Sequence, residues 1–145
     1  MIEIHGQIID GLGLATRFLK KQLPLICREF PELKKCRPGT INIELETPLR
    51  IERPDYITRK INWGEQKEVF HFTRAEFELL PPGPARPGPR PVYGAWIYGP
   101  QNSPHRTNPF IIEIICERRI ELRGRPPCRI RLDRAGRQTP LTIVD

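Results

Sequence analysis

The chain has 145 residues, enough for one domain with a buried core. No apolar run is long enough to span a bilayer and the first residues do not resemble a signal peptide, so we expect a cytoplasmic protein without membrane contact. The net charge of +7 favours anionic partners such as nucleotides, nucleic acid or acidic surfaces, without choosing among them. The 17 prolines disfavour long helices almost everywhere.

The first third of the chain predicts a strand, a glycine turn and one helix. Alternating apolar and polar residues predict a half-buried strand over Ile2–Ile9. A glycine-containing turn follows at 10–15, and a short strand is expected at 16–19. Leu23, Ile26, Cys27 and Phe30 then recur at helical spacing, with Pro24 placed to stand in the first turn.

The remainder of the chain predicts short strands separated by turns. Ile41, Ile43 and Leu45 share one face of a strand over 41–46, and Asn42, Glu44 and Glu46 share the other. The strand at 110–117 is so apolar that we expect it to be buried on both faces. Further strand segments are predicted at 49–52, 69–72, 77–80, 92–98, 128–133 and 141–144.

A proline- and glycine-rich segment at 81–91 is the sharpest break in composition. It lacks the backbone donors and conformational freedom that a packed element needs. We interpret it as an exposed loop between two strands of a single domain over residues 1–145; the alternative is a polyproline ligand for an SH3-like partner. Short strands, frequent turns and one helix predict a mainly β protein, a barrel or sandwich with an inserted helix.

The cysteines, histidines and tryptophans indicate packing more than chemistry. The four cysteines include no C-x-x-C pair, so we expect reduced, mostly buried thiols and no structural zinc site. The three histidines have no metal-ligand spacing, and His71 is expected on the polar face of a strand. Trp63 and Trp96 are expected to be core or rim aromatics.

Two segments contain residues suited to binding phosphate and metal. Gly11 and Gly13 follow the first strand, where small residues form either a tight turn or a backbone cradle for phosphates. A Rossmann site is not expected, because no helix is predicted directly after this loop. Thr40 and Asn42 project from one strand face, so their oxygens suit either Mg²⁺ shared with substrate phosphates or ordinary strand-edge hydrogen bonds.

Together these segments resemble a known enzyme family. The sequence reads Gly11-Leu-Gly13-Leu-Ala15-Thr-Arg-Phe18, then the predicted helix, then Pro38-Gly39-Thr40-Ile41-Asn42-Ile43-Glu44-Leu45. This order and spacing resembles the CTP-dependent, archaeal-type riboflavin kinases. Arg106-Thr107 and Glu113-Ile114-Ile115 resemble a later part of the same family pattern. The resemblance covers residues 4–50 well, 92–123 fairly and the middle poorly.

The resemblance implies a closed six-stranded barrel of the cradle-loop type with one inserted helix. The implied reaction is Mg²⁺-assisted transfer of the γ-phosphoryl group of CTP to the 5′-hydroxyl of riboflavin, giving FMN, in a protein that we expect to be monomeric. The resemblance also places Mg²⁺ on Thr40 and Asn42, and the flavin on Thr107 and Glu113. The nucleotide would contact Gly11, Leu12, Gly13, Leu14, Ala15, Thr16, Arg118, Arg119, Ile120 and Glu121.

Departures from the family pattern leave two alternatives. Ala15 replaces the third glycine of the loop, and Cys116-Glu117 replaces an Ala-Pro pair. These two departures favour the first alternative, a non-catalytic or differently specific nucleotide- or flavin-binding module on the same barrel. The positive charge favours a nucleic-acid-binding domain, although no RNP-like or KH-like motif is present. No catalytic residue is assigned: Asp10 and Glu44 are possible general bases by location, and His105 is a possible flavin contact.

Overall fold

A computed structural model of the chain describes residues 2–9, 15–51, 53–81, 91–100, 108–118, 120, 124–132 and 141–142. For residues 15, 16, 100, 141 and 142 it describes only the backbone. No helix in the described part combines the length and the apolar character needed to cross a membrane.

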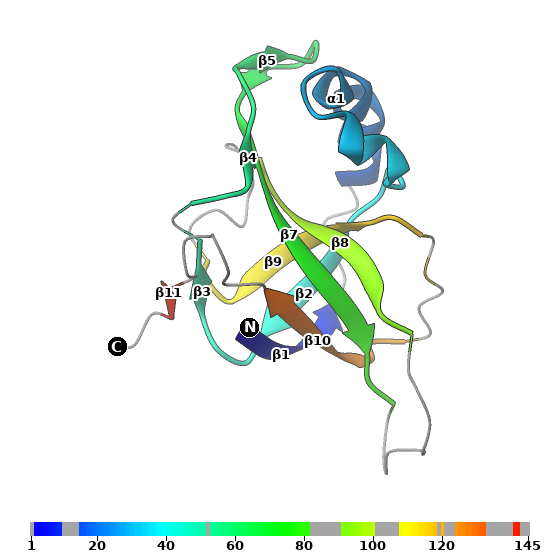
Figure 1. Cartoon of the computed structure of the whole chain (residues 1–145), viewed down its shortest axis with the longest axis vertical. Helices are drawn as coiled ribbons and strands as arrows, with labels where there is room; N and C mark the ends of the chain where they lie inside the picture. Colours follow the sequence, from blue (N-terminus) through cyan, green and yellow to red (C-terminus); the bar gives the residue numbers. More distant parts are fainter. Residues whose placement is uncertain are drawn as a thin grey trace.

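The main feature of the fold is a closed antiparallel barrel of six strands (Figure 1). In spatial order the strands are β10, β1, β2, β9, β8 and β7, and pairing of β7 with β10 closes the ring. This confirms the mainly β, six-stranded barrel with one inserted helix. Their bounds are β1 Ile2–Ile9, β2 Ile41–Leu45, β7 Phe70–Leu79, β8 Tyr93–Pro100, β9 Ile111–Cys116 and β10 Pro127–Leu132.

The barrel interior is filled by side chains that alternate along each strand. Isoleucine dominates this cluster, and its branched side chain suits the pleated inner surface. As predicted, β9 is buried on both faces: Ile112 and Ile114 point into the barrel, and Ile115 packs outside it. Completely buried interior residues include Ile43, Phe77, Ala95, Ile114, Cys128 and Ile130.

A second apolar core lies between the outer face of the barrel and the helix. The helix α1 (Ala15–Glu29) covers this face, followed by the 3₁₀ helix η1 (Pro31–Lys35), as Figure 1 shows for α1. Leu19 and Ile26 of α1 are fully buried. They belong to a cluster that includes Phe70, Phe72, Trp96, Tyr98 and Ile115 of the barrel.

The start of the helix differs from the prediction. Residues 16–19 are helical rather than extended, and Pro24 lies in the interior of α1 rather than in its first turn. A proline there costs a helix about 3 kcal/mol. Burial of Leu19, Leu23 and Ile26 on the barrel side offsets this cost, while Pro24 stays exposed. A helix therefore does begin directly after the glycine loop, although β1 and β2 are antiparallel and form no βαβ unit.

The two strand segments predicted at 69–72 and 77–80 are parts of one ten-residue strand, β7. Thr73 and Arg74 interrupt the apolar pattern between them, but both belong to the continuous pairing of β7 with β8. The first part of β7 also pairs with β4 (Tyr56–Ile57), and its last part pairs with β10. One long strand can therefore be part of the barrel and extend beyond it.

Two small sheets flank the barrel. β3 (Leu49–Arg50) pairs with β11 (Leu141–Thr142), close to the predicted segments. The hairpin of β5 (Ile61–Asn62) and β6 (Lys67–Glu68) was not predicted. Gly64 has a φ of +104° in its turn, a conformation that favours glycine. Lys21 of α1 contacts Glu65 at 2.9 Å and so links the helix to this hairpin.

Several smaller predictions can be compared with the structure. All four cysteines are free and buried, as expected. Trp63 and Trp96 are buried core residues, and His71 is exposed on β7. The proline-rich segment connects β7 with its antiparallel neighbour β8, which confirms that it joins two adjacent strands; residues 82–90 themselves lie outside the described part.

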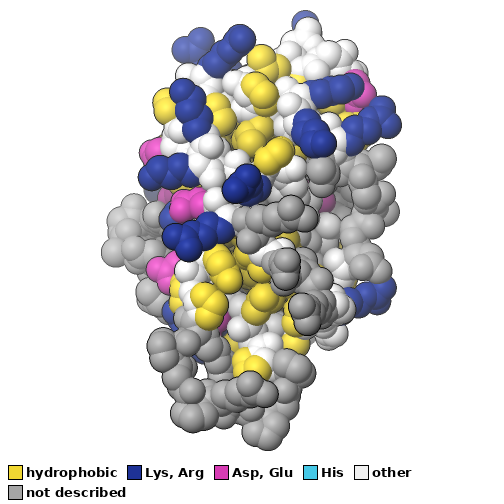
Figure 2. All heavy atoms as spheres, turned by 90° about the vertical axis from the view of Figure 1, so that its right-hand side faces the viewer, with side chains coloured by type: hydrophobic (Ala, Val, Ile, Leu, Met, Phe, Trp, Pro, Cys, Tyr) yellow, Lys and Arg dark blue, Asp and Glu magenta, His cyan; other side chains and the backbone are white. Residues whose placement is uncertain are grey.

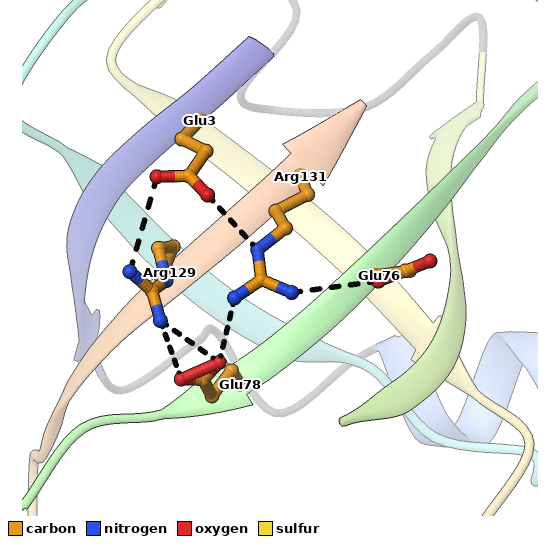
Figure 3. A network of polar contacts seen from close by, with 5 residues as sticks. All are labelled: Glu3, Glu76, Glu78, Arg129 and Arg131. Atoms are coloured by element: carbon orange, nitrogen blue, oxygen red, sulfur yellow. Dashed lines mark hydrogen bonds and ion pairs between the residues drawn. The ribbon is translucent and has the colours of Figure 1, made fainter. Parts of the chain in front are cut away.

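An ion-pair network spans the seam where the barrel closes (Figure 3). Glu78 of β7 is buried and accepts hydrogen bonds from Arg129 at 2.7 Å and Arg131 at 3.1 Å, both on β10. Glu3 of β1 contacts the same two arginines, and Glu76 lies 3.7 Å from Arg131. The network therefore joins three neighbouring strands across the closing pair.

Candidate functional site

The described residues that flank three of the segments singled out in the sequence, those after β1, before β2 and after β9, lie at one end of the barrel. β1 ends and β2 begins at this end, β9 also ends there, and β10 begins there. Two backbone hydrogen bonds fix the arrangement: Ile8 N donates to Pro126 O at 3.1 Å, and Arg37 N donates to Cys116 O at 2.9 Å. The connections after β1, before β2 and after β9 therefore leave the barrel close together.

A row of register partners crosses four strands, starting at this end with β1 and β2. Ile9, the last residue of β1, pairs with Asn42 of β2. Asn42 pairs with Glu113 of β9, and Glu113 pairs with Tyr98 of β8. Register partners on adjacent antiparallel strands have Cβ atoms roughly 5 Å apart on the same face of the sheet. We call Asn42, Glu113 and Tyr98 the polar rung.

The polar rung lies on the outer face of the barrel. Ile43, Ile112 and Ile114, the sequence neighbours of Asn42 and Glu113, point into the barrel interior. Tyr98 belongs to the core cluster beneath α1, and its hydroxyl donates to Gln22 Oε1 of that helix. The rung therefore lies on the face that α1 covers.

Glu113 is a carboxyl group on the buried face beneath α1. Its exposure is only 8%, and burial raises its pKa from 4.5 to about 7. Burial also raises the pKa of Tyr98, and the nearby Glu113 and Glu68 carboxylates raise it further. At neutral pH Glu113 therefore exists both as a carboxylic acid that can donate a hydrogen bond and as a carboxylate that can only accept one.

Asn42 presents a buried acceptor that no described residue satisfies. The residue is 7% exposed, and its Oδ1 accepts no hydrogen bond from the described part of the chain. A buried polar atom without a partner is costly, so a ligand at this position would be stabilising. Thr40, two residues earlier, is partly exposed.

The oxygens of Asn42 and Thr40 are of the chemical type that binds a hard cation such as Mg²⁺. Mg²⁺ prefers neutral or anionic oxygen ligands and usually takes only a few from the protein, completing its shell with water and phosphate oxygens. Asn42 Oδ1 and the Thr40 hydroxyl are ligands of that kind. Among the described residues, no three His, Cys, Asp or Glu side chains gather in a way that would hold a metal.

Several predicted site residues are described only in part or not at all. Ala15 and Thr16 are the first residues of α1, and their side chains are not described. Arg118 is exposed just after β9, whereas Ile120 is half-buried against the barrel interior. Outside the described part lie Gly11, Leu12, Gly13, Leu14, Thr107, Arg119 and Glu121, as do the possible contacts Asp10 and His105.

The structure adds polar residues that the sequence analysis missed. Gln22 is buried beside the rung, and Glu68 accepts a hydrogen bond from Trp63 Nε1 at 2.9 Å beneath the helix. Gln22 stands within the apolar stripe of the helix, between Leu19 and Ile26. A polar residue at a core-facing helical position was the available signal for it. Glu44, by contrast, is exposed on the outer side of β2.

Comparisons with known proteins give no family for the chain. No protein-family model matches it, and no curated protein matches it.

Proposed function

We propose that the protein is a Mg²⁺-dependent riboflavin kinase that uses CTP as phosphoryl donor. The observation that supports this most is the register of β2 and β9, which pairs Asn42 with Glu113. The sequence resemblance assigns these two residues to metal and flavin from motifs far apart in the chain. A kinase needs its metal–phosphate site and its acceptor site to be neighbours, and the two motifs lie on adjacent strands.

The described residues on both sides of the glycine loop support a role for that loop in the same site. Ile9, which immediately precedes that loop, is the register partner of Asn42. The helix α1 begins at Ala15, directly after the loop. Free backbone N–H groups and the helix dipole make a helix N-terminus favourable for anions, so this region suits the triphosphate of the donor.

The proposed reaction requires positioning and charge neutralisation more than covalent help. The 5′-hydroxyl oxygen of riboflavin forms a bond to the γ-phosphorus of CTP. The bond from that phosphorus to the oxygen bridging the β-phosphate breaks, CDP leaves with the electron pair, and the hydroxyl proton passes to water. When bound, Mg²⁺ supplies charge neutralisation at the phosphate oxygens. Thr40 and Asn42 would hold it beside the acceptor.

Glu113 would orient the flavin. The isoalloxazine ring carries carbonyl acceptors and an N–H donor along one edge. A carboxyl group with a pKa of about 7 can match either kind of group at neutral pH. Tyr98 and Gln22 hold the neighbouring part of the face through their hydrogen bond. Because Glu113 is already desolvated, a hydrogen bond from the flavin would compete little with water.

A second candidate is a flavin- or nucleotide-binding module that does not catalyse transfer. It is favoured by Glu117, which stands where the resembled family has proline. Glu117 Oε1 contacts Arg74 Nη1 at 2.5 Å, and its backbone N–H donates to Gly94 O at 3.1 Å. These contacts link the segment after β9 to β7 and β8. A proline at this position has neither the side-chain carboxylate nor the backbone N–H, so it could form neither contact.

FMN formation from riboflavin, CTP and Mg²⁺ by purified variants tests the proposal. Thr40→Ala and Asn42→Ala should each lower the rate at least about a hundredfold, because a lost contact to transition-state charge costs roughly 3 kcal/mol. Glu113→Ala should weaken riboflavin binding, measured by flavin fluorescence. Lys67→Ala, on the exposed side of β6, is the matched control and should leave the rate unchanged.

The outcomes separate the two candidates. Loss of FMN formation in the Thr40 and Asn42 variants, with the Lys67 variant active, supports the kinase. Binding of riboflavin or CTP by the wild-type protein with no FMN formed would reject the kinase and favour the binding module. Wild-type activity in the Asn42→Ala variant would reject the proposed metal site.

A further inference from the structure

A groove beside α1 lies outside the polar rung. It has a volume of about 460 Å³ and runs between one flank of the helix and the segment that follows it. Leu23 and Cys27 are four residues apart on α1, as are Lys20 and Pro24, so together they form one stripe of the helix. The lining residues are Lys20, Leu23, Pro24, Cys27, Lys34 and Pro38.

The chemistry of the groove is an apolar floor with a positive rim. Among the described residues, two lysines and no acidic side chain line it. Both lysines are exposed, and neither forms an ion pair with a described carboxylate, whereas Lys21 and Arg17 on the other flank contact Glu65. The charge of Lys34 is felt at the floor of the groove. Burial raises the pKa of the Cys27 thiol, and the positive charge of Lys34 partly lowers it again.

The surroundings add to this positive field. Lys35 and Arg37 are exposed in the same segment as Lys34 and Pro38. Figure 2 shows the side of the molecule that lies on the right in Figure 1, where α1 is at the top. Over its upper part, Lys and Arg side chains surround hydrophobic ones. Positive charge around a concave apolar surface attracts anions and gives an apolar body a place to bind.

We propose that this groove binds a small organic anion. Its apolar body would lie on Leu23, Pro24 and Cys27, and its negative group would lie between Lys20 and Lys34. The volume falls in the range of small-molecule sites, roughly 300–1,000 Å³. A strongly hydrated inorganic anion would gain nothing from the floor, and a neutral apolar molecule would gain nothing from the lysines. A second copy of the chain that packed groove against groove would bring a second pair of lysines against the first.

The test uses 8-anilinonaphthalene-1-sulfonate, an apolar aromatic body that carries one negative charge. Titration by fluorescence and by calorimetry should show one molecule bound per chain. N-phenyl-1-naphthylamine, its neutral relative, and sodium sulfate should each bind about tenfold more weakly or worse, because each lacks one half of the recognition. Riboflavin and CTP are absent, so the result is independent of the proposed kinase activity.

Matched charge variants locate the site. The double variant Lys20→Gln/Lys34→Gln should bind the probe about fivefold more weakly, the effect expected from two exposed charge pairs. Lys60→Gln/Lys67→Gln removes two exposed lysines elsewhere and should bind it as the wild type does. Circular dichroism and the thermal midpoint check that both variants are folded.

Three results would overturn the proposal. The first is wild-type affinity in Lys20→Gln/Lys34→Gln, and the second is an equal loss in Lys60→Gln/Lys67→Gln. The third is a dimer of the free protein, seen by sedimentation, that dissociates in Lys20→Gln/Lys34→Gln, because the groove would then be occupied by a second copy.

Discussion

Replacing Glu113 by glutamine should stabilise the fold at pH 8.5 and change its stability much less at pH 4. Glu113 is 8% exposed, and burial raises the pKa of its carboxyl from 4.5 to about 7. Between these values the folded chain keeps a proton that the unfolded chain has released. Folding stability therefore falls as the pH rises through this window, and the loss is complete above about pH 7.

The size of the effect follows from the two pKa values. A difference of one between folded and unfolded pKa corresponds to 1.36 kcal/mol, so a rise from 4.5 to about 7 costs the folded state about 3 kcal/mol. Glutamine has nearly the same shape as glutamate and cannot ionise. The stability of Glu113→Gln relative to wild type should therefore increase by about 3 kcal/mol between pH 4 and pH 8.5.

Urea unfolding at the two pH values, with EDTA present, measures this difference. Comparing variant with wild type cancels the contribution of the other titrating groups, and Glu44→Gln on the exposed side of β2 is the control. The control should give the same small difference at both pH values. If the Glu113→Gln difference changes by less than about 1 kcal/mol across this range, the carboxyl is not held in a desolvated site and the reasoning is wrong.

Three further predictions concern the scaffold, each measured by denaturant unfolding. Glu78→Ala should destabilise the fold by about 3 kcal/mol because it leaves two partly buried arginines without their shared partner, while Glu76→Ala at the exposed edge of the same network should cost below about 1 kcal/mol. Gly6→Ala should cost about 2 kcal/mol because its Cβ would lie 2.7 Å from a β2 carbonyl oxygen; Gly99→Ala, with its nearest neighbour at 3.6 Å, should cost much less. Pro24→Ala should stabilise the fold by up to about 3 kcal/mol, since it restores a good helix former in the interior of α1. Equal losses of stability in the two glutamate variants would contradict the first prediction, and equal losses in the two glycine variants would contradict the second. A Pro24→Ala variant less stable than the wild type would contradict the third.

Local patterns in the sequence predict the strands well where one or both faces are buried. Ile2–Ile9 alternates because β1 has one face in the barrel and one in solvent, and the strand has the predicted bounds. The apolar run at 111–116 reflects β9, which has the barrel on one side and α1 on the other. The environment alternates along β1 and is apolar on both sides along β9, and in each case the sequence shows the matching pattern.

The helix start was missed for a physical reason. Pro24 favours a first turn in isolated sequence, but packing of Leu19 against the barrel extends the helix to Ala15. Tertiary burial outweighs a local preference of a few kcal/mol. Gln22 is polar although it lies in the apolar stripe of the helix, because it accepts a hydrogen bond there from Tyr98. Tyr98 belongs to a strand far along the chain, so no local pattern could indicate this contact.

The candidate site depends on pairing that no local pattern contains. Thr40, Asn42 and Glu113 could be singled out from motifs, but their proximity depends on the register of β2 with β9. The closure of the barrel depends likewise on pairing of β7 with β10. A shift of one residue in the β2–β9 register would exchange inward and outward side chains, so the burial of both strands determines it.

The most direct test of the central claim is a donor panel with the wild-type protein. Riboflavin and Mg²⁺ are incubated in parallel with CTP, ATP, GTP or UTP, and FMN is separated from riboflavin and quantified. We predict FMN with CTP and little with the other three nucleotides, and none with CTP when EDTA removes Mg²⁺. FMN with only another nucleotide would retain the kinase and reject CTP as its donor. No FMN with any donor, from protein shown to be folded, would contradict the proposed function.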